Sequence, residues 1–343
     1  MISARRRWIG ASAGLAALLV LVGAYAARAL HTAEAPTRID VAATPITSFD
    51  NRDPTRTRFG ALEFRGGLAL TSHFKAFGGI SALHMEPDGA HFIAVTDNGS
   101  WLKARIVYEG DKPIGLADAE MAPALGSDGT PLAATHWYDL ESLAERDGKF
   151  YVGIERVNQI VKFDFRKEGF EARGQPIPVP GDFKTFTYNK SLECLTAPPA
   201  GAPLAGSLIA VTEHSLDSAG NHRGFVLNGN HVDRFSVKRS DDFDVSDCTI
   251  LPPNDLLLLE RSFSPLRGVA MRIRRVSLAS VKDGALIDGT PLITADLGFQ
   301  IDNMEGIGVH RTPSGETVLT LVSDDNFSAI QRNLLLQFTL VGE

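Results

Sequence analysis

Acidic residues recur along this chain at the ends of short apolar segments. Each segment has the composition of a β-strand, and five of them end on a carboxylate: Asp97, Glu155, Glu213, Glu260 and Asp324. The successive carboxylates are 58, 58, 47 and 64 residues apart. In four copies another acid stands near the start of the preceding apolar segment: Glu141, Glu193, Asp247 and Glu305. Paired carboxylates in repeated units could act on a substrate or bind a cation.

If these acids gather in one place, they predict a cation site. Carboxylates at short range repel one another and raise each other's pKa, so cations must compensate them. Oxygen ligands at this density suit Ca²⁺ or another divalent cation such as Mg²⁺. We assign metal binding to five residues: Asp97, Glu141, Glu155, Asp324 and Asp325. The alternative is structural, because acids at turns also cap backbone amides and form salt bridges between neighbouring units.

Residues that neighbour these acids in the sequence could take part in the same site. We assign catalytic roles to Glu193, Glu305, Lys190 and His214. Asn98, Arg156 and Arg261 each follow a closing carboxylate directly and are candidates for substrate binding. His214 could instead be a hydrogen-bonded residue of the rim. The sequence contains no HExxH motif or phosphate-binding glycine loop, and its G-x-S-x-G match at 10–14 lies in the apolar N-terminal run and not at a strand-to-helix turn. These features disfavour serine hydrolase, zinc protease and nucleotide-dependent chemistry.

The repeat itself predicts the elements that would position these residues. Asp88-Gly89, Asp147-Gly148 and Ser314-Gly315 lie between the two apolar segments of a copy, where a hairpin turn belongs. Strand repeats of about 50 residues predict a β-propeller of four-stranded blades. The first strand of a blade starts, and the second ends, at the same mouth of the central channel. We therefore expect the acids to meet at one mouth.

The number of blades follows from the strand count. Five copies predict five blades, although 108–137 or 262–296 could hide a sixth. The last copy supplies only three strands, ending at 334–340. Residues 60–70 have strand character and could complete it. An N-terminal strand in the last blade would close the ring and remove its open edge.

The two ends of the sequence differ in charge. The chain of 343 residues has a net charge of −7, and its first 30 residues hold four Arg and no acid. An acidic remainder excludes nucleic acid as a partner. We expect a small anionic or ester ligand and a monomeric protein.

The N-terminus looks like a targeting segment. Arg5–Arg7 precede an apolar run over 8–27, so 1–30 is predicted to be a cleaved signal peptide or a retained membrane anchor. Residues 31–57 look like a polar linker, and 58–343 form the propeller domain. The predicted location is periplasmic or secreted, with anchoring to the inner membrane through 8–27 as the alternative.

Two cysteines stand in equivalent places. Cys194 and Cys248 each follow an acid of their repeat directly. An exported protein could oxidise them to a disulfide, if adjacent inner strands bring their Cα atoms within about 7 Å. Otherwise they are two small buried residues.

Four motifs carry a resemblance to a known family: GGIS (78–81), NKSLEC (189–194), NMEGIG (303–308) and LVSDDNF (321–327). Through them the chain resembles exported bacterial proteins with a phytase-like domain, described as having the esterase-like activity of phytase, over about 58–340. In that family the third motif usually has glycine where Ser191 and Cys194 stand here.

The resemblance implies a β-propeller, export, and hydrolysis of a phosphoester or a carboxylic ester. Together with the acids, it predicts a metal-assisted hydrolase that works in an acid-lined central funnel. Two alternatives stay open. One is a non-catalytic periplasmic propeller that binds a ligand or partner. The other is a lactonase-like, Ca²⁺-dependent hydrolase.

Overall fold

The computed structural model describes residues 32–187 and 190–342. The predicted signal peptide or anchor, with its apolar run 8–27, lies outside the described residues. No helix in the described part of the chain is long and apolar enough to cross a membrane. The described residues belong to one compact unit, which begins at Thr32.

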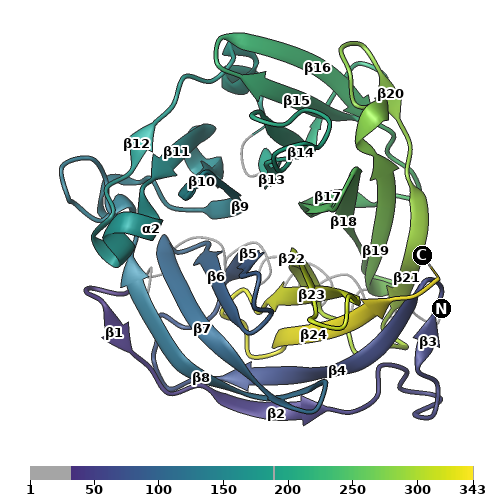
Figure 1. Cartoon of the computed structure of the whole chain (residues 1–343). Helices are drawn as coiled ribbons and strands as arrows, with labels where there is room; N and C mark the ends of the chain where they lie inside the picture. Colours follow the sequence, from purple (N-terminus) through teal and green to yellow (C-terminus); the bar gives the residue numbers. More distant parts are fainter. Residues whose placement is uncertain (1–31, 188–189, 343) are drawn as a thin grey trace, which may run out of the picture. The chain divides into compact units, whose positions relative to one another are not determined.

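The described chain forms a five-bladed β-propeller, as predicted. Its strands make five antiparallel sheets, and Figure 1 shows these sheets arranged around a common axis. The innermost strands, nearest the axis, are β5 (Ile80–Met85), β9 (Leu140–Arg146), β13 (Leu192–Thr196), β17 (Asp244–Leu251) and β22 (Asn303–Arg311). Five sheets account for all the strands, so neither long insertion within the described residues hides a sixth blade.

Blades 1 and 2 follow the sequence order outward from the axis. Blade 1 continues from β5 with β6 (His91–Thr96), β7 (Ser100–Glu109), β8 (Lys112–Pro123) and the short edge strand β1 (Thr37–Arg38). Blade 2 continues from β9 with β10 (Lys149–Ile154), β11 (Gln159–Phe163) and β12 (Gln175–Pro176). Short helical turns connect these strands: η1 (Leu132–Thr135), η2 (Glu155–Val157), α2 (Phe165–Glu168) and η3 (Gly169–Glu171).

Blade 3 receives one short strand from the chain segment that builds blade 4. Blade 3 continues from β13 with β14 (Leu208–Leu216), β15 (His222–Asn228) and β16 (His231–Val237), and η4 (Gly181–Thr185) precedes it. Blade 4 continues from β17 with β18 (Asp255–Ser264), β19 (Gly268–Ser277), the turn η5 (Leu278–Ser280) and β21 (Thr290–Asp296). The connection inside blade 4 sends β20 (Leu286–Ile287) to pair in parallel with β16 of blade 3.

Blade 5 closes the ring with N-terminal strands, as predicted. It continues from β22 with β23 (Thr317–Asp324), β24 (Asn333–Leu340), β4 (Leu62–Thr71) and β2 (Ala42–Ile46), and β3 (Arg58–Phe59) pairs with β4. β24 and β4 pair along their whole length, from Asn333 opposite Leu70 to Leu340 opposite Leu62. The two ends of the propeller sequence thereby share one sheet. Because β4 pairs with β24, β24 is not an exposed edge strand.

Residues 32–57 differ from the expected polar linker. β1 pairs with β8 of blade 1, and β2 pairs with β4 of blade 5. Phe49 is fully buried against the rings of Phe59 and Phe338. The polar composition of this stretch reflects its place on the outer edge of two blades, where one face of a strand meets solvent.

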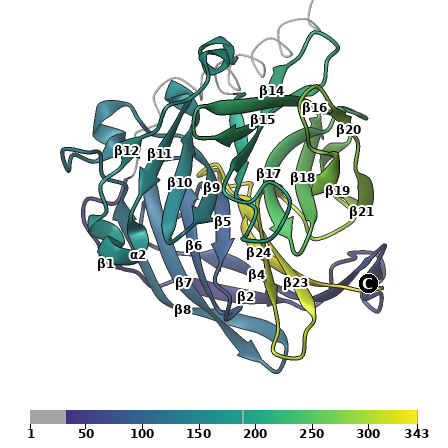
Figure 2. The ribbon, with the colours of Figure 1, turned by 45° about the horizontal axis from the view of Figure 1, so that its top comes forward.

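Apolar side chains fill the spaces between neighbouring blades. One such core packs Trp101 of blade 1 against Phe163 and Phe165 of blade 2. Between blades 3 and 4 the core contains a disulfide from Cys194 to Cys248, with Cα atoms 5.0 Å apart. The disulfide that the sequence left open therefore links the inner strands β13 and β17. Figure 2 shows the strands running between the two faces of the propeller.

Candidate functional site

A β-bulge interrupts the inner strand of every blade at the same point. In blade 2, Gly153 pairs with Ser142 but Ile154 pairs with Leu140, which leaves Glu141 unpaired. The same register shift in the other blades leaves one residue unpaired in each: Ser81, Glu193, Ser246 and Glu305. A bulge bends the strand and re-aims the side chain of its extra residue. We call Glu141, Glu193 and Glu305 the bulge glutamates, and the end of the propeller that carries them the acidic mouth.

The second strand of each blade adds one more side chain at this level. In each blade, the second-strand residue one position beyond the pair that flanks the bulge is one of the following: Asp97, Glu155, Glu213, Arg261 and Asp324. Four of these five are acids, and blade 4 alone contributes a cation. The sequence predicted a closing carboxylate from all five repeats at this level, and the backbone register brings one there from four of them.

The three bulge glutamates lie close enough together to hold one metal ion. Each offers a carboxylate oxygen within 4.8 Å of the other two. Glu193 is 4% exposed, and among the described residues its Oε2 has no hydrogen-bond partner. A buried carboxylate oxygen without a partner is costly unless a cation or proton satisfies it. The donor set, all hard oxygen, fits Ca²⁺ or another hard divalent cation.

Two further oxygen triads overlap this one. Asp139, Glu141 and Glu155 meet the same 4.8 Å limit, as do Glu155, Glu193 and Glu213. Glu155 already accepts a hydrogen bond from the Ser191 amide at 2.5 Å. The bulge glutamates are therefore the best candidates for the ligands of a central cation.

Burial shapes the titration of these acids. Desolvation raises the pKa of Glu141 and Glu193 well above the ordinary glutamate value, and the neighbouring carboxylates raise it further. Desolvation likewise raises the pKa of Glu155, to about 8. For Glu305 burial raises the pKa and Arg261 opposes it, with a net increase. Without a cation the mouth thus holds protons at neutral pH, and a bound cation would displace them.

Arg261 is the cation built into the ring. Its Nη2 lies 3.0 Å from Glu213 Oε1 and 3.5 Å from Glu305 Oε1, and its Nη1 donates to Asn303 Oδ1 at 2.9 Å. Burial alone would lower the pKa of Arg261, but Glu305 and Glu213 outweigh it and keep the guanidinium charged. Arg261 is thus committed to holding carboxylates from two other blades.

The other predicted cations occupy the rim. Lys190 Nζ is 3.7 Å from Glu213 Oε2. Arg156 Nε is 3.4 Å from Asp139 Oδ2, and its guanidinium stacks over the Tyr138 ring at 4.2 Å. Arg156 is therefore held by residues of its own blade. Among the predicted substrate-binding and catalytic cations, Lys190 has the longest contact with a carboxylate.

Two acids expected at the mouth lie elsewhere. The bulge of blade 4 falls at Ser246, so Asp247 faces the inner strand of blade 5, where its Oδ2 accepts a hydrogen bond from the Ile307 amide at 2.7 Å. Glu260 is fully buried between two arginines. Its Oε2 lies 2.7 Å from Arg272 Nε, and its Oε1 lies 2.5 Å from Arg274 Nη2. Both expectations were wrong by one residue, because alternate residues of a strand face opposite sides.

The acids of blades 5 and 1 also make local contacts. Asp324 Oδ1 accepts from the Asn326 amide at 2.6 Å, and Asp325 Oδ1 accepts from the amides of Gly79 and Phe327 at 3.1 and 3.0 Å. Gly79 has φ of +62°, and a side chain there would collide with Asp97. The Gly-Gly motif thus gives the close approach that lets Asp97 and Asp325 meet this backbone.

The remaining predicted residues take two different positions. Asn98 is buried; it accepts a hydrogen bond from the Thr96 hydroxyl at 2.6 Å, so it stabilises the turn between β6 and β7. His214 is partly exposed at the mouth, and its Nδ1 lies 3.0 Å from Asp244 Oδ1.

Sequence reasoning missed the residues two positions before the bulge glutamates. Asp139 stands two residues before Glu141, and Asn303 two before Glu305, whose Oε1 accepts from Asn303 Nδ2 at 2.6 Å. In both places a polar residue precedes the glutamate by two positions, and this shared spacing could have identified them. Asp244 had no such signal, because it is linked to His214 only through the packing of blade 4 on blade 3.

These features define a five-bladed β-propeller with a carboxylate-lined mouth that is suited to a divalent cation. Residues 75–327 match the phytase-like family, described as esterase-like activity of phytase. The match covers most of the chain, which therefore belongs to this family, as its motifs predicted. A comparison with curated proteins found none that matches.

Solved structures resemble the chain in fold only. U3-55K is 10% identical, with a TM-score of 0.38, over 80% of this chain and 98% of that one. The RRP9 WD40 repeats are 13% identical, with a TM-score of 0.39, over 80% and 84%. Glutaminyl cyclase of Myxococcus xanthus is 10% identical, with a TM-score of 0.37, over 77% and 97%. Likeness at this level carries no argument about function.

Proposed function

We propose that the protein is a cation-dependent hydrolase of a phosphoester or carboxylic ester, with Glu141, Glu193 and Glu305 as the ligands of a Ca²⁺ or similar divalent ion. The observation that carries the proposal is the convergence of these buried carboxylates within 4.8 Å, with Glu193 Oε2 lacking a partner among the described residues. When bound there, such a cation would polarise an ester and lower the pKa of a water molecule.

The chain's own residues supply position and charge. Arg261 holds Glu213 and Glu305 in place and neutralises part of the ring. Lys190 stands at the rim, where an anionic group of the substrate could bind it. Family membership supports an ester as the substrate class, and the acidic surroundings require that an anionic ester approach only after a cation is bound.

The direct test uses the purified full-length chain. It is stripped with a chelator and titrated by calorimetry with Ca²⁺, Mg²⁺ and Mn²⁺, and turnover is then measured on panels of phosphate monoesters and carboxylic esters. We expect E193Q and E305Q to lose cation binding and turnover while their circular dichroism stays unchanged. E63Q, which alters an exposed acid of β4, is the matched control.

Retention of full activity after complete removal of divalent ions would exclude the proposal. A second candidate, a non-catalytic cation-dependent binding propeller, is favoured by the engagement of Arg156 and Arg261 with carboxylates of the protein itself. It predicts stoichiometric cation binding that depends on Glu193, without turnover of any ester in the panel.

A further inference from the structure

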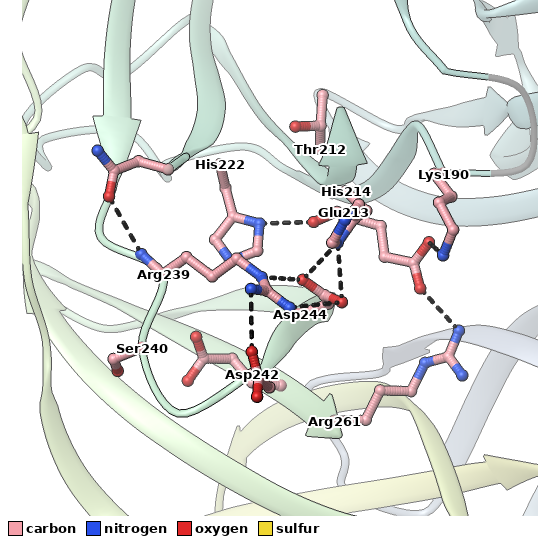
Figure 3. Close-up of polar contacts among 12 residues, drawn as sticks. Lys190, Thr212, Glu213, His214, His222, Arg239, Ser240, Asp242, Asp244 and Arg261 are labelled. Atoms are coloured by element: carbon pink, nitrogen blue, oxygen red, sulfur yellow. Dashed lines mark hydrogen bonds and ion pairs between the residues drawn. The ribbon is translucent and has the colours of Figure 1, made fainter. Parts of the chain in front are cut away.

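The nitrogen-bearing side chains open to solvent at the acidic mouth gather on the side of blade 3. Figure 3 shows Lys190 and Arg261 at the two carboxylate oxygens of Glu213, with His214 beside them. The side chain of Lys190 is 45% exposed and that of His214 is 36% exposed, whereas the bulge glutamates are buried. A ligand that enters from solvent would therefore meet these two residues before it reaches the carboxylates.

Lys190 is fixed through its backbone, while its side chain is loosely held. Its carbonyl accepts hydrogen bonds from the His214 amide at 3.2 Å and the Ser215 hydroxyl at 3.0 Å. The 3.7 Å separation of Nζ from Glu213 Oε2 is longer than a hydrogen bond. A half-exposed ion pair of this kind contributes little to stability, so the ammonium can turn to a ligand at little cost.

His214 is oriented by a carboxylate of the next blade. Its Nδ1 lies 3.0 and 3.1 Å from the two oxygens of Asp244, and Arg239 Nε donates to Asp244 Oδ1 at 2.6 Å (Figure 3). Burial raises the pKa of Asp244, but the hydrogen bonds from Arg239 and His214 outweigh it and leave the pKa below the ordinary value. Asp244 is therefore a carboxylate that fixes the Nδ1 edge, and the Nε2 edge of the ring points away from it.

We propose that Lys190 and His214 form an oxyanion subsite that binds the phosphate or carboxylate group of the substrate and of its hydrolysis product. The ammonium supplies a mobile charge, and the doubly protonated ring of His214 donates from Nε2 while Asp244 accepts from Nδ1 and sets its orientation. The inference rests on the proposed function, because the ring must first hold a cation. Nine carboxylates stand at or beside the mouth: Asp97, Asp139, Glu141, Glu155, Glu193, Glu213, Glu305, Asp324 and Asp325.

This charge balance makes the subsite conditional. Arg156, Lys190 and Arg261 are the cations paired with those carboxylates, and three positive charges cannot balance nine ionised acids. An oxyanion would be repelled from such a mouth unless protons or a divalent cation reduced its charge. Oxyanion binding should therefore be tighter when Ca²⁺ occupies the ring than in chelator.

The test is calorimetric titration of the full-length chain with inorganic phosphate and, separately, with acetate, each with saturating Ca²⁺ and with a chelator. We expect Ca²⁺-dependent binding of one of the two ions. Tighter phosphate binding identifies a phosphoester product, and tighter acetate binding identifies a carboxylic ester product. K190Q and H214Q should each weaken that binding about five- to tenfold, and the double variant should weaken it further.

The matched controls keep residue type and change position. K184Q removes an exposed lysine of η4, and H231Q removes a histidine that also pairs with an aspartate, Asp233, but on the outer strand β16. Both controls should bind the oxyanion like the parent protein. Equal affinity in K190Q, H214Q and the parent protein would overturn the subsite.

The outcomes separate this inference from the proposed function. Failure of Ca²⁺ itself to bind would remove both. Ca²⁺ binding that depends on Glu193, without any oxyanion binding, would refute the subsite and leave the cation site standing. D244N tests positioning: it should weaken oxyanion binding about as much as H214Q, and its effect should vanish when His214 is already replaced.

Discussion

Arg261 donates from Nη2 to Glu213 Oε1 at 3.0 Å and thereby joins blade 4 to blade 3 across the acidic mouth. The residue occupies the ring position that holds Asp97, Glu155, Glu213 and Asp324 in the other blades. One cation in an otherwise acidic ring breaks the five-fold pattern. It gives Glu213 and Glu305 a positively charged partner and leaves the side of Glu141 and Glu193 for an external cation.

Removing Arg261 should therefore destabilise the protein in a way that metal ions reverse. We expect R261Q to lower the free energy of unfolding by about 2 kcal/mol in chelator at pH 8, because two buried carboxylates lose a charged donor. Saturating Ca²⁺ should restore most of this loss. Urea denaturation with and without Ca²⁺ measures both quantities; an equal loss under the two conditions would contradict a shared electrostatic role.

Glu193 and Glu260 should respond in opposite ways to the same substitution. E260Q breaks a fully buried network with Arg272 and Arg274 and should cost about 3 kcal/mol, with no change in cation affinity. E193Q removes a buried carboxylate whose Oε2 has no hydrogen-bond partner among the described residues, so it should raise the melting temperature of the metal-free protein and lower cation affinity at least about tenfold. Thermal melts and calorimetry distinguish the two. If E193Q melts at a lower temperature in chelator, Glu193 has a structural role.

The metal-free protein should lose stability as pH rises from 7 to 9. The folded-state pKa values of Glu141, Glu155 and Glu193 lie above the unfolded values, so the native state binds more protons than the unfolded state in this range. The stability that these groups contribute is fully present below the ordinary glutamate pKa of 4.5 and is lost as pH rises through the folded-state pKa of Glu155, about 8.

Melting temperatures in chelator and in Ca²⁺ test this expectation. Ca²⁺ should flatten the decline and should release protons on binding at pH 7.5, seen as a binding enthalpy that depends on the buffer. The range stays above pH 7 because burial lowers the pKa of His84, His222 and His310, which acts in the opposite direction below about pH 6.5. Stability that rises between pH 7 and 9 without metal would refute the assignment.

The disulfide should support the site as well as the fold. Cys194 follows Glu193 directly, and Cys248 lies two residues after the bulge at Ser246. The C194S/C248S variant should lose about 4 kcal/mol, the chain-entropy value for a separation of 54 residues. It should also bind Ca²⁺ more weakly. The measurement is chemical denaturation together with calorimetry; unchanged Ca²⁺ affinity in the folded variant would show that the bond does not position Glu193.

The sequence by itself determined the repeat and therefore the architecture. Apolar pairs of segments around Asp-Gly and Ser-Gly turns specify hairpins locally, and five copies specify five blades. The strand at 60–70 was recognisable as the missing partner of the last blade, because an unpaired edge is unfavourable. The same logic placed Glu141, Glu193 and Glu305 at one mouth, since inner strands that start together must present their first side chains together.

Only the tertiary structure decided which side chains face the axis. A one-residue register shift at each bulge moves a side chain to the other face, which turned Asp247 toward blade 5, Glu260 toward β19 and Arg261 toward the acidic mouth. Asp244 meets His214 from another blade, 30 residues away, through packing that no local pattern records. The repeat fixes where a site can form, and the bulges together with contacts between blades select the few residues that make it.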